Sequence, residues 1–352
     1  MHIPDDRTIR SPGLILLLGA CLVGFVTVSL SDIRTNAVFE PITQTAGPAR
    51  SGDLQPVEAF EEVDVAGVVC AEHPLVPPMF AGLEDELWAS PMLHHPPFAA
   101  EVEKWVGFWS QNFSKWMPSY LERMTSFEAM VDSVIEDRGL PGSLRYLPII
   151  ESGYSPTAVS SASAVGMWQF MAPTARDFGI EVGPLVDDRR DPFVSTEAAT
   201  TYLLQLRDDF DSWFLALAAY NAGPDRINGL LERYLPDVEP SDAVYWALRD
   251  VLPMETADFV PNLIGAAIVA SDPAAYGYGV PPRRAFDFEP IPVLGSVSFE
   301  TIARAAGSSR AEIERLNPEY LRGRTPPERE VELRLPPGTA ETFRSYFEDE
   351  GF

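Results

Sequence analysis

The sequence predicts a mainly α-helical protein that ends in a small, separate module, and three observations support this. From about Phe98 onward, apolar residues recur at the three-to-four-residue spacing of amphipathic helices. The chain shows no strand–helix alternation of the kind that builds a parallel sheet. A stretch rich in proline and glycine, from Tyr276 to Pro292, precedes a segment with a different and shorter pattern.

The N-terminus carries a targeting signal. Arg7 and Arg10 precede an uncharged apolar run from Gly13 to Leu30, which is typical of a signal peptide or a short membrane anchor. Within this run, a Leu-Gly-Ala-Cys sequence ending at Cys21 is similar to a bacterial lipobox, whose cysteine becomes acylated. The apolar run continues past this cysteine, which favours an anchor or an ordinary signal peptide. All of these alternatives predict export to the periplasm or cell envelope, and residues 1–30 are assigned to this segment.

Residues 31–80 are rich in proline and threonine and lack sustained periodicity, which favours a linker. The helical region that follows begins with an aromatic stripe near one helix face. The stripe consists of Trp105, Phe108, Trp109, Phe113, Trp116 and Tyr120. Such a stripe can stack on sugar rings, but burial against the rest of the domain is the favoured interpretation. A second helix is predicted to start after a hydroxyl cap at Thr125 and Ser126 and to end at Gly139.

A third helix is predicted from near Ser143 toward Glu151, and Pro148 should bend or shorten it because proline lacks an amide donor. Further helices are expected over about 195–209, 213–220, 224–234 and 256–270. Beyond the proline- and glycine-rich stretch, the pattern predicts two small helices. They are followed by a strand, because the residues from Val331 to Leu335 alternate between apolar and charged.

The composition limits the possible partners. The 352 residues carry a formal net charge of −26, from 52 acidic and 26 basic side chains. Such a surface repels phosphate groups, so no nucleic-acid partner is predicted. The histidines lack the spacing of metal ligands on a helix, and Cys70 has no partner for a disulfide once Cys21 is removed or acylated. Neither a metal nor a cofactor is predicted.

Glu151 is a candidate general acid because of its neighbours in the sequence. The apolar run from Leu147 to Ile150 ends at this carboxyl group, and Ser152 and Gly153 follow at once. Apolar surroundings disfavour the charged form and raise the pKa of a glutamate toward the value that a general acid needs. A glutamate at a helix end is more often a surface residue, so this prediction depends on the segments that follow.

Three further segments strengthen the prediction that Glu151 is a general acid. They are Ser160 with Gly166-Met167-Trp168-Gln169-Phe170-Met171, Arg189-Arg190-Asp191-Pro192, and Ala219-Tyr220-Asn221-Ala222-Gly223. Together with Glu151-Ser152, they resemble the family 1 lytic transglycosylases (glycoside hydrolase family 23, goose-lysozyme-like). Within this family, the segments look most like those of the membrane-bound lytic murein transglycosylase D group. The resemblance covers about residues 98–272. It implies a catalytic domain of the lysozyme-like fold (α+β superfamily), assigned here to residues 81–275.

The resemblance also implies roles for individual residues. Glu151 matches the family's single catalytic acid/base. Residues that line the cleft or pack on the bound sugar in the family match Ser160, Gln169 and Met171. Tyr220 and Asn221 match the pair beside the reacting ring, and Tyr202 matches a tyrosine whose hydroxyl helps to stabilise the intermediate. Glu255 is expected to line the cleft, with a salt bridge elsewhere as the alternative.

The mechanism implied by the resemblance needs only one carboxyl group. Protonated Glu151 gives its proton to the oxygen that joins N-acetylmuramic acid to N-acetylglucosamine, and the substrate's acetamido oxygen meets the developing positive charge. Glu151 then takes the proton of the carbon-6 hydroxyl, which closes a 1,6-anhydro ring without water. Ordinary glycosidases use two carboxyl groups, and the family role of Asp187, Asp188 and Asp191 looks structural.

Two regions depart from the family pattern. After Glu255-Thr256, relatives often carry an arginine and a tyrosine where this chain has Ala257 and Phe259, so any contacts of those groups are in doubt. The C-terminal segment, residues 290–340, weakly resembles a LysM domain, a small glycan-binding unit of βααβ order. Its usual opening Gly-Asp-Thr-Leu is replaced by Gly295-Ser296-Val297-Ser298-Phe299. Glycan binding and simple packing therefore both stay open for this module.

The leading hypothesis is an exported peptidoglycan lytic transglycosylase whose partners are glycan strands and, through its N-terminus, the membrane. A goose-type lysozyme would share the fold and substrate but would use water, and the product would then be heavier by one water molecule. A third alternative is a catalytically silent glycan-binding protein. The intact set of Glu151, Gln169, Tyr220 and Asn221 argues against it.

Overall fold

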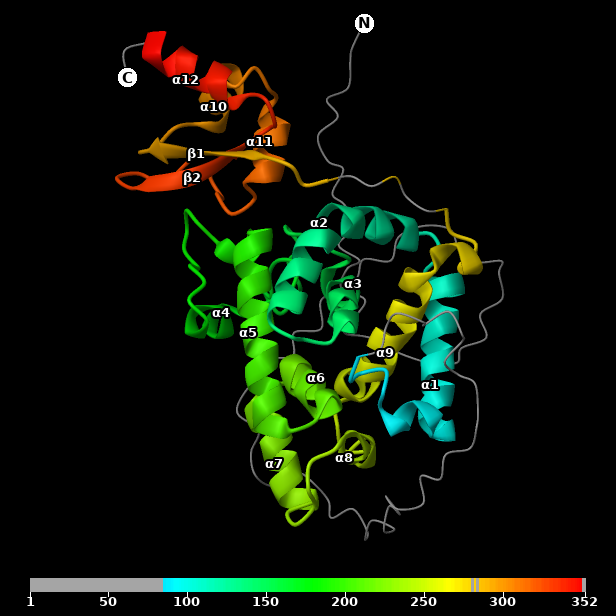
Figure 1. Cartoon of the computed structure of the whole chain (residues 1–352). Coiled ribbons are helices and arrows are strands. Elements are labelled where there is room, and N and C mark those ends of the chain that lie inside the picture. Colours follow the sequence, from blue (N-terminus) through cyan, green and yellow to red (C-terminus); the bar gives the residue numbers. More distant parts are fainter. Residues whose placement is uncertain (1–84, 280–281, 283–284, 350–352) are drawn as a thin grey trace, which may run out of the picture.

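The computed structural model describes residues 85–279, 282 and 285–349, which form a helical body (residues 85–279) and a C-terminal module (residues 285–349) (Figure 1). The assigned signal or anchor at residues 1–30 and the linker at 31–80 lie outside the described residues. Within the described part of the chain, no helix is both long enough and apolar enough to cross a membrane.

The α-helices of the helical body are α1 Pro96–Gly107, α2 Met117–Asp137, α3 Leu147–Ser152, α4 Ala172–Asp177, α5 Pro192–Phe210, α6 Trp213–Ala222, α7 Pro224–Tyr234, α8 Asp242–Ala247 and α9 Met254–Ser271. Shorter turns of other helix types connect them, namely the 3-10 turns η4 Pro91–His94, η6 Gly142–Tyr146, η7 Asp188–Arg190 and η8 Pro273–Tyr276, and the π-helical turn η5 Phe108–Asn112. The helices enclose one large hydrophobic core in which α6 and α9 are buried along most of their length.

The start predicted for the second helix is wrong. Helix α2 begins at Met117 and runs straight through Thr125, which lies in the middle of the helix and whose hydroxyl donates to the carbonyl of Glu122 at 2.8 Å. The true start is explained by Pro118, because a proline is tolerated only in the first turn of a helix. The preceding aromatic stripe is split between α1, the π-helical turn and α2. Trp109, Phe113 and Tyr120 are buried, and the other three members are partly buried and pack against the same core, as expected for packing residues.

The segment that carries Glu151 is broken into two pieces at the residues around Pro148. A 3-10 turn, η6, is followed by the six-residue helix α3, and the proline lies in the first turn of α3. The helix ends at Gly153, which has a left-handed φ of 59°. A Cβ atom at this glycine would lie 2.5 Å from the ring of Tyr120, so both the turn and the close packing require glycine here.

The remaining predicted helices are confirmed with small changes at their ends, as α5, α6, α7 and α9. Helices α4 and α8, which have six residues each, were not predicted. They are too short to show a helical period in the sequence. The fold class is confirmed as mainly helical.

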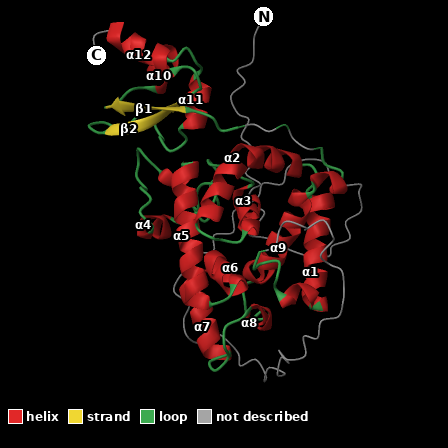
Figure 2. Ribbon diagram, in the orientation of Figure 1, coloured by secondary structure: helices red, strands yellow, loops and turns green. Residues whose placement is uncertain are grey.

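The C-terminal module has the βααβ order expected from the sequence, followed by one more helix (Figure 2). Its elements are β1 Glu289–Leu294, α10 Phe299–Ala305, α11 Arg310–Leu316, β2 Glu330–Leu335 and α12 Ala340–Asp349. The two strands pair antiparallel, with Glu289 opposite Leu335 and Leu294 opposite Glu330. Figure 1 shows the module beyond the N-terminal end of α5.

Candidate active site

Glu151 lies in the last turn of α3, directly after the buried Ile149 and Ile150, and its own side chain is only partly exposed. Burial raises the pKa of Glu151 from its ordinary value to about 8, and the negative charge of Glu255 adds to this increase. A carboxyl group with this pKa keeps its proton at neutral pH. It therefore has the protonation state that a general acid needs.

The residue after Glu151 fastens α3 to the turn formed by residues 166–169. The hydroxyl of Ser152 donates to the carbonyl of Met167 at 2.8 Å and accepts from the amide of Ser155 at 3.1 Å. Ser152 is completely buried. Because the bond is shielded from water, it fixes the end of the helix that carries Glu151 against the turn that carries Gln169.

The turn of residues 166–169 is closed by two backbone hydrogen bonds between Val165 and Phe170, each 3.1 Å long. Gln169 adopts a left-handed φ of 50°, which is unusual for a residue other than glycine. Its side-chain amide donates to the carbonyl of Gly166 at 2.8 Å. Gly166 has a φ of 88°, and a Cβ atom there would lie 1.8 Å from the carbonyl oxygen of Arg189, so only glycine fits.

Two tyrosines pack beside the same turn. The hydroxyl of Tyr220, near the end of α6, donates to the carbonyl of Trp168 at 2.7 Å. Burial raises the pKa of Tyr220 well above its ordinary value, and the nearby charge of Glu151 adds to this. The ring of Tyr202, on α5, lies with its centroid 5.5 Å from that of Tyr220. Tyr202 is thus in contact with the site through the ring of Tyr220.

The side chain of Asn221 is held by the first turn of α9. Its amide nitrogen donates to Glu255 at 3.4 Å, and its oxygen accepts from the hydroxyl of Thr256 at 2.8 Å. Burial raises the pKa of Glu255, and the hydrogen bond from Asn221 opposes this. Glu255 therefore faces the site and influences the pKa of Glu151, while the salt bridge considered as its alternative is not formed with any described residue.

Ser160 and Met171 lie on the two sides of the turn. The hydroxyl of Ser160 accepts from the amide of Ala164 at 3.0 Å, so it stabilises its own loop. Met171 directly precedes α4 and is 44% exposed, which leaves its side chain available for contact with a ligand. The structure thus places both Tyr220 and Glu255 close enough to Glu151 for electrostatic interaction and holds Gln169 through its turn, whereas the Ser160 hydroxyl accepts a bond within its own loop.

Four residues that support this arrangement were not assigned a role from the sequence, and they are Ser152, Trp168, Arg189 and Thr256. Ser152 and Thr256 each follow a predicted site glutamate, and Trp168 directly precedes Gln169. Trp168 is fully buried, and its indole nitrogen donates to the hydroxyl of Thr196 on α5 at 2.9 Å. For these three, the available signals were the position next to a site residue and membership of a motif block. Among the described residues, no group of three or more His, Cys, Asp or Glu side chains could hold a metal ion.

Comparison with known proteins finds two family domains in the chain. Residues 136–234 match the transglycosylase SLT domain family, and residues 287–349 match the LysM-like domain of the lytic transglycosylase MltD. The chain therefore carries an SLT domain, within which Glu151, Gln169 and Tyr220 lie, and a LysM-like domain of the MltD type.

Among individual proteins, the chain is similar to the membrane-bound lytic murein transglycosylase D of Escherichia coli strain K12, with 34% identity over 148 residues. This match covers 42% of the chain but only 32% of the relative. The peptidoglycan transglycosylase gp16 of Escherichia phage T7 is 41% identical over 95 residues, which cover 26% of this chain and 7% of gp16. A solved structure of an inactive mutant of the lytic transglycosylase Slt from Pseudomonas aeruginosa matches with a TM-score of 0.34 and 26% identity, over 44% of this chain and 25% of that one.

Proposed function

We propose that this protein is a peptidoglycan lytic transglycosylase. It cleaves the β-1,4 bond between N-acetylmuramic acid and N-acetylglucosamine and leaves a 1,6-anhydromuramoyl end. The observation that carries this proposal is the protonation state of Glu151. This carboxyl group lies at a helix end, and burial and Glu255 raise its pKa to about 8. The match of residues 136–234 to the transglycosylase SLT domain and the similarity to a membrane-bound lytic murein transglycosylase D support the same reaction.

In the first step, Glu151 gives its proton to the bridging oxygen, and the bond from that oxygen to the anomeric carbon of the muramoyl residue breaks. The acetamido oxygen of the same sugar shares the positive charge that develops. A neutral acid is required here, and the raised pKa of Glu151 provides one at pH 7.

In the second step, Glu151 is ionised and accepts the proton of the carbon-6 hydroxyl of the muramoyl residue. That oxygen attacks the anomeric carbon and closes the anhydro ring, so no water is consumed. Gln169, Tyr220 and Asn221 are proposed to bind and orient the reacting sugar, with Ser160, Met171 and Tyr202 at the edge of the cleft. Each of these roles is a proposal that rests on position and on the family resemblance.

A hydrolytic reaction of the goose-lysozyme type is the second candidate, and one observation favours it. Glu255 is a second carboxyl group close enough to Glu151 to raise its pKa, and two carboxyl groups are what a hydrolase uses to protonate the bond and to activate water. Against this, the Glu255 carboxyl accepts a hydrogen bond from Asn221. The two reactions differ in the mass of the product by one water molecule.

The decisive experiment is digestion of purified peptidoglycan, followed by mass spectrometry of the products. We expect anhydro-muropeptides from the wild type and a loss of at least roughly a thousandfold in their rate of release with Glu151→Gln. Glu341→Gln, which changes an exposed carboxyl group on α12, is the matched control and should behave as wild type. Products that carry a reducing end would favour the hydrolase, and no product from folded wild type would favour a silent binding protein.

The place of action is proposed to be the cell envelope, because peptidoglycan lies there and residues 1–30 have the pattern of an export signal or anchor. Cell fractionation of the wild type, with Cys21→Ala as the comparison, tests this. Incorporation of labelled palmitate that is lost in Cys21→Ala would establish lipidation. Membrane association that survives the substitution would point to an uncleaved anchor.

A further inference from the structure

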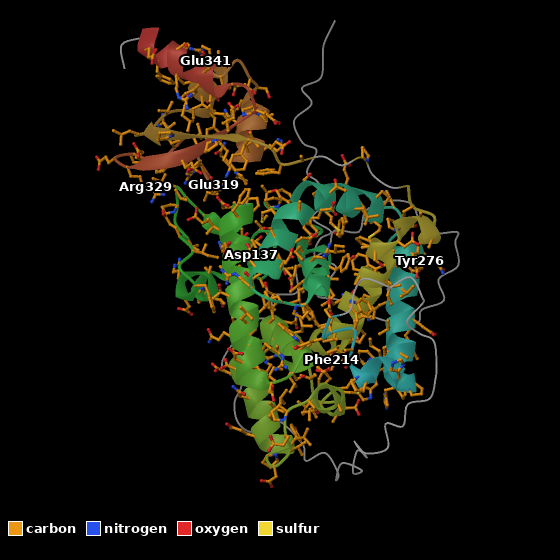
Figure 3. The ribbon with its side chains drawn as sticks, in the orientation of Figure 1. Asp137, Phe214, Tyr276, Glu319, Arg329 and Glu341 are labelled. Carbon is orange, nitrogen blue, oxygen red and sulfur yellow. The ribbon has the colours of Figure 1, made fainter. Side chains whose placement is uncertain are left out.

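The C-terminal module is joined to the helical body by the backbone itself. Val186 and Tyr320 form an antiparallel bridge. The amide of Asp187 donates to the carbonyl of Glu319 at 3.0 Å, and the amide of Leu321 donates to the carbonyl of Leu185 at 2.9 Å. Figure 3 shows Glu319 and Arg329 at this boundary between the two parts. Linked in this way, the two parts are held in one fixed arrangement.

A buried charge cluster lies at the same boundary. Arg334, on β2, is 9% exposed and donates hydrogen bonds to Asp191 and, at 3.3 Å, to Glu319. Burial raises the pKa of Glu319, and the positive charge of Arg334 opposes this increase. The guanidinium also lies over the rings of Phe193 and Phe288, at 5.1 and 5.4 Å from their centroids.

Asp191 uses its two carboxylate oxygens for different purposes. Oδ1 accepts the amides of Phe193 at 2.8 Å and Val194 at 3.1 Å, and so caps the start of α5. Oδ2 accepts from Arg334 of the C-terminal module. The module therefore holds the segment of residues 187–191 by hydrogen bonds at both ends. At one end the bond is made by the amide of Asp187, and at the other by the carboxylate of Asp191.

The same segment supports the turn that carries Gln169. Arg189 is fixed by two hydrogen bonds of 2.8 Å to the carboxylate of Asp187, and it donates to the carbonyl of Phe170 at 3.1 Å. Its own carbonyl oxygen occupies the space beside Gly166 where a Cβ atom would be. A shift of the segment must therefore move the turn.

We propose that Arg334 is a positioning residue for the active-site turn of residues 166–169, acting through Asp191 and Arg189, so that the C-terminal module forms a fixed support of the catalytic site. Removal of Arg334 leaves the buried Asp191 without its counter-ion. The segment of residues 187–191 then relaxes toward solvent, and the bond from Arg189 to Phe170 weakens. The effect on catalysis rests on the function proposed above, whereas the effect on the turn does not.

The first test measures hydrogen–deuterium exchange in the full-length chain. We expect the amides of Val165 and Phe170, which close the turn, to exchange at least roughly tenfold faster in Arg334→Met, with exchange in α6 unchanged. Arg334→Lys keeps the charge and should restore most of the protection. Arg310→Met is the matched control, because it removes an exposed arginine of the same module whose ion pairs among the described residues are with Glu300 and Glu314.

The second test separates positioning from general destabilisation. At a temperature where circular dichroism shows every variant folded, kcat for release of anhydro-muropeptides should fall at least roughly tenfold in Arg334→Met, with KM changed less than about threefold. Asp191→Asn keeps the cap oxygen and removes the anionic partner. If the two residues act through one contact, adding Arg334→Met to Asp191→Asn should lower kcat by less than about twofold further.

Unchanged exchange at Val165 and Phe170 in Arg334→Met, or independent and multiplying losses of kcat in the double variant, would overturn the proposal. A wild type that releases no anhydro product would instead refute the proposed function, while the exchange measurement still judges the role of Arg334. Should Arg334→Met fail to fold, Asp191→Asn carries both measurements, and wild-type behaviour of Asp191→Asn in both would equally overturn the proposal.

Discussion

The hydroxyl of Ser152 lies 2.8 Å from the carbonyl oxygen of Met167 and donates to it in a fully buried position. This contact joins the helix that carries Glu151 to the turn that carries Gln169. The same turn accepts a second bond from Tyr220, at the carbonyl of Trp168. The proposed acid and its neighbours are therefore placed by one small set of buried hydrogen bonds.

Substitution of Ser152 by alanine should destabilise the protein by about 1–3 kcal/mol, because the carbonyl of Met167 and the amide of Ser155 lose a buried partner. Chemical denaturation gives the free energy of unfolding. Ser114→Ala removes an exposed hydroxyl that also donates to a carbonyl, at 2.7 Å, and should change stability by less than about 0.5 kcal/mol. Equal effects of the two substitutions would show that the Ser152 bond has no special weight.

Gly166→Ala should prevent folding or cost more than about 3 kcal/mol, since the new methyl group would collide with the carbonyl of Arg189 at 1.8 Å. Gly179 offers a matched control, because its φ of 79° is similar but no atom lies within 4 Å of the place that a methyl group would take. Gly179→Ala should cost only the backbone strain, about 1–2 kcal/mol. Thermal melting of both variants measures the difference, and a Gly166→Ala protein as stable as Gly179→Ala would contradict the packing described above.

The pH dependence of the reaction should report the protonation of Glu151. Activity requires the protonated acid, so kcat/KM should fall as pH rises through about 8. Glu255→Gln removes a negative charge that raises the pKa of Glu151. The fall of kcat/KM at high pH, called the alkaline limb, should therefore move to lower pH by roughly one unit. Glu341→Gln should leave the limb in place. A limb that does not move in Glu255→Gln would show that the two carboxyl groups do not interact.

Glu151 should also lower the stability of the protein in a pH-dependent way. Its folded pKa of about 8 exceeds the ordinary value of 4.5, so the folded state retains a proton that the unfolded chain releases between these pH values. Stability is consequently lost as pH rises through this window. Glu151→Gln should match wild type at about pH 4 and exceed it by on the order of 2 kcal/mol at about pH 8. A variant that is less stable than wild type at the higher pH would contradict the burial of this group.

Much of the helical body could be predicted from the sequence because its long helices carry a clear apolar period. The exceptions have local causes. Helix α2 starts at Met117, well before the predicted cap, since the position of Pro118 decided its start and the hydroxyl of Thr125 bonds within the helix. The segment before Glu151 divides near Pro148 into a 3-10 turn and a short helix, because a proline is tolerated only in the first turn of a helix.

For the candidate site, the sequence supplied the residues with chemistry but not those that hold them. Glu151, Gln169 and Tyr220 were predicted through motif blocks. Thr256 and Arg189 act through hydrogen bonds to residues far away in the chain, and such pairings leave no periodic signal. The contact between Arg334 and Asp191 joins residues 143 positions apart and could be found only in three dimensions.

Val186 belongs to the loop before α5, yet its side chain is buried in the small hydrophobic core of the C-terminal module, together with Ile302 and Leu333. Neither core can melt by itself without exposing apolar surface or breaking backbone bonds that the other provides. The two parts should accordingly form one cooperative unit. Scanning calorimetry should then give a single heat-absorption peak, where a flexibly tethered module would give two.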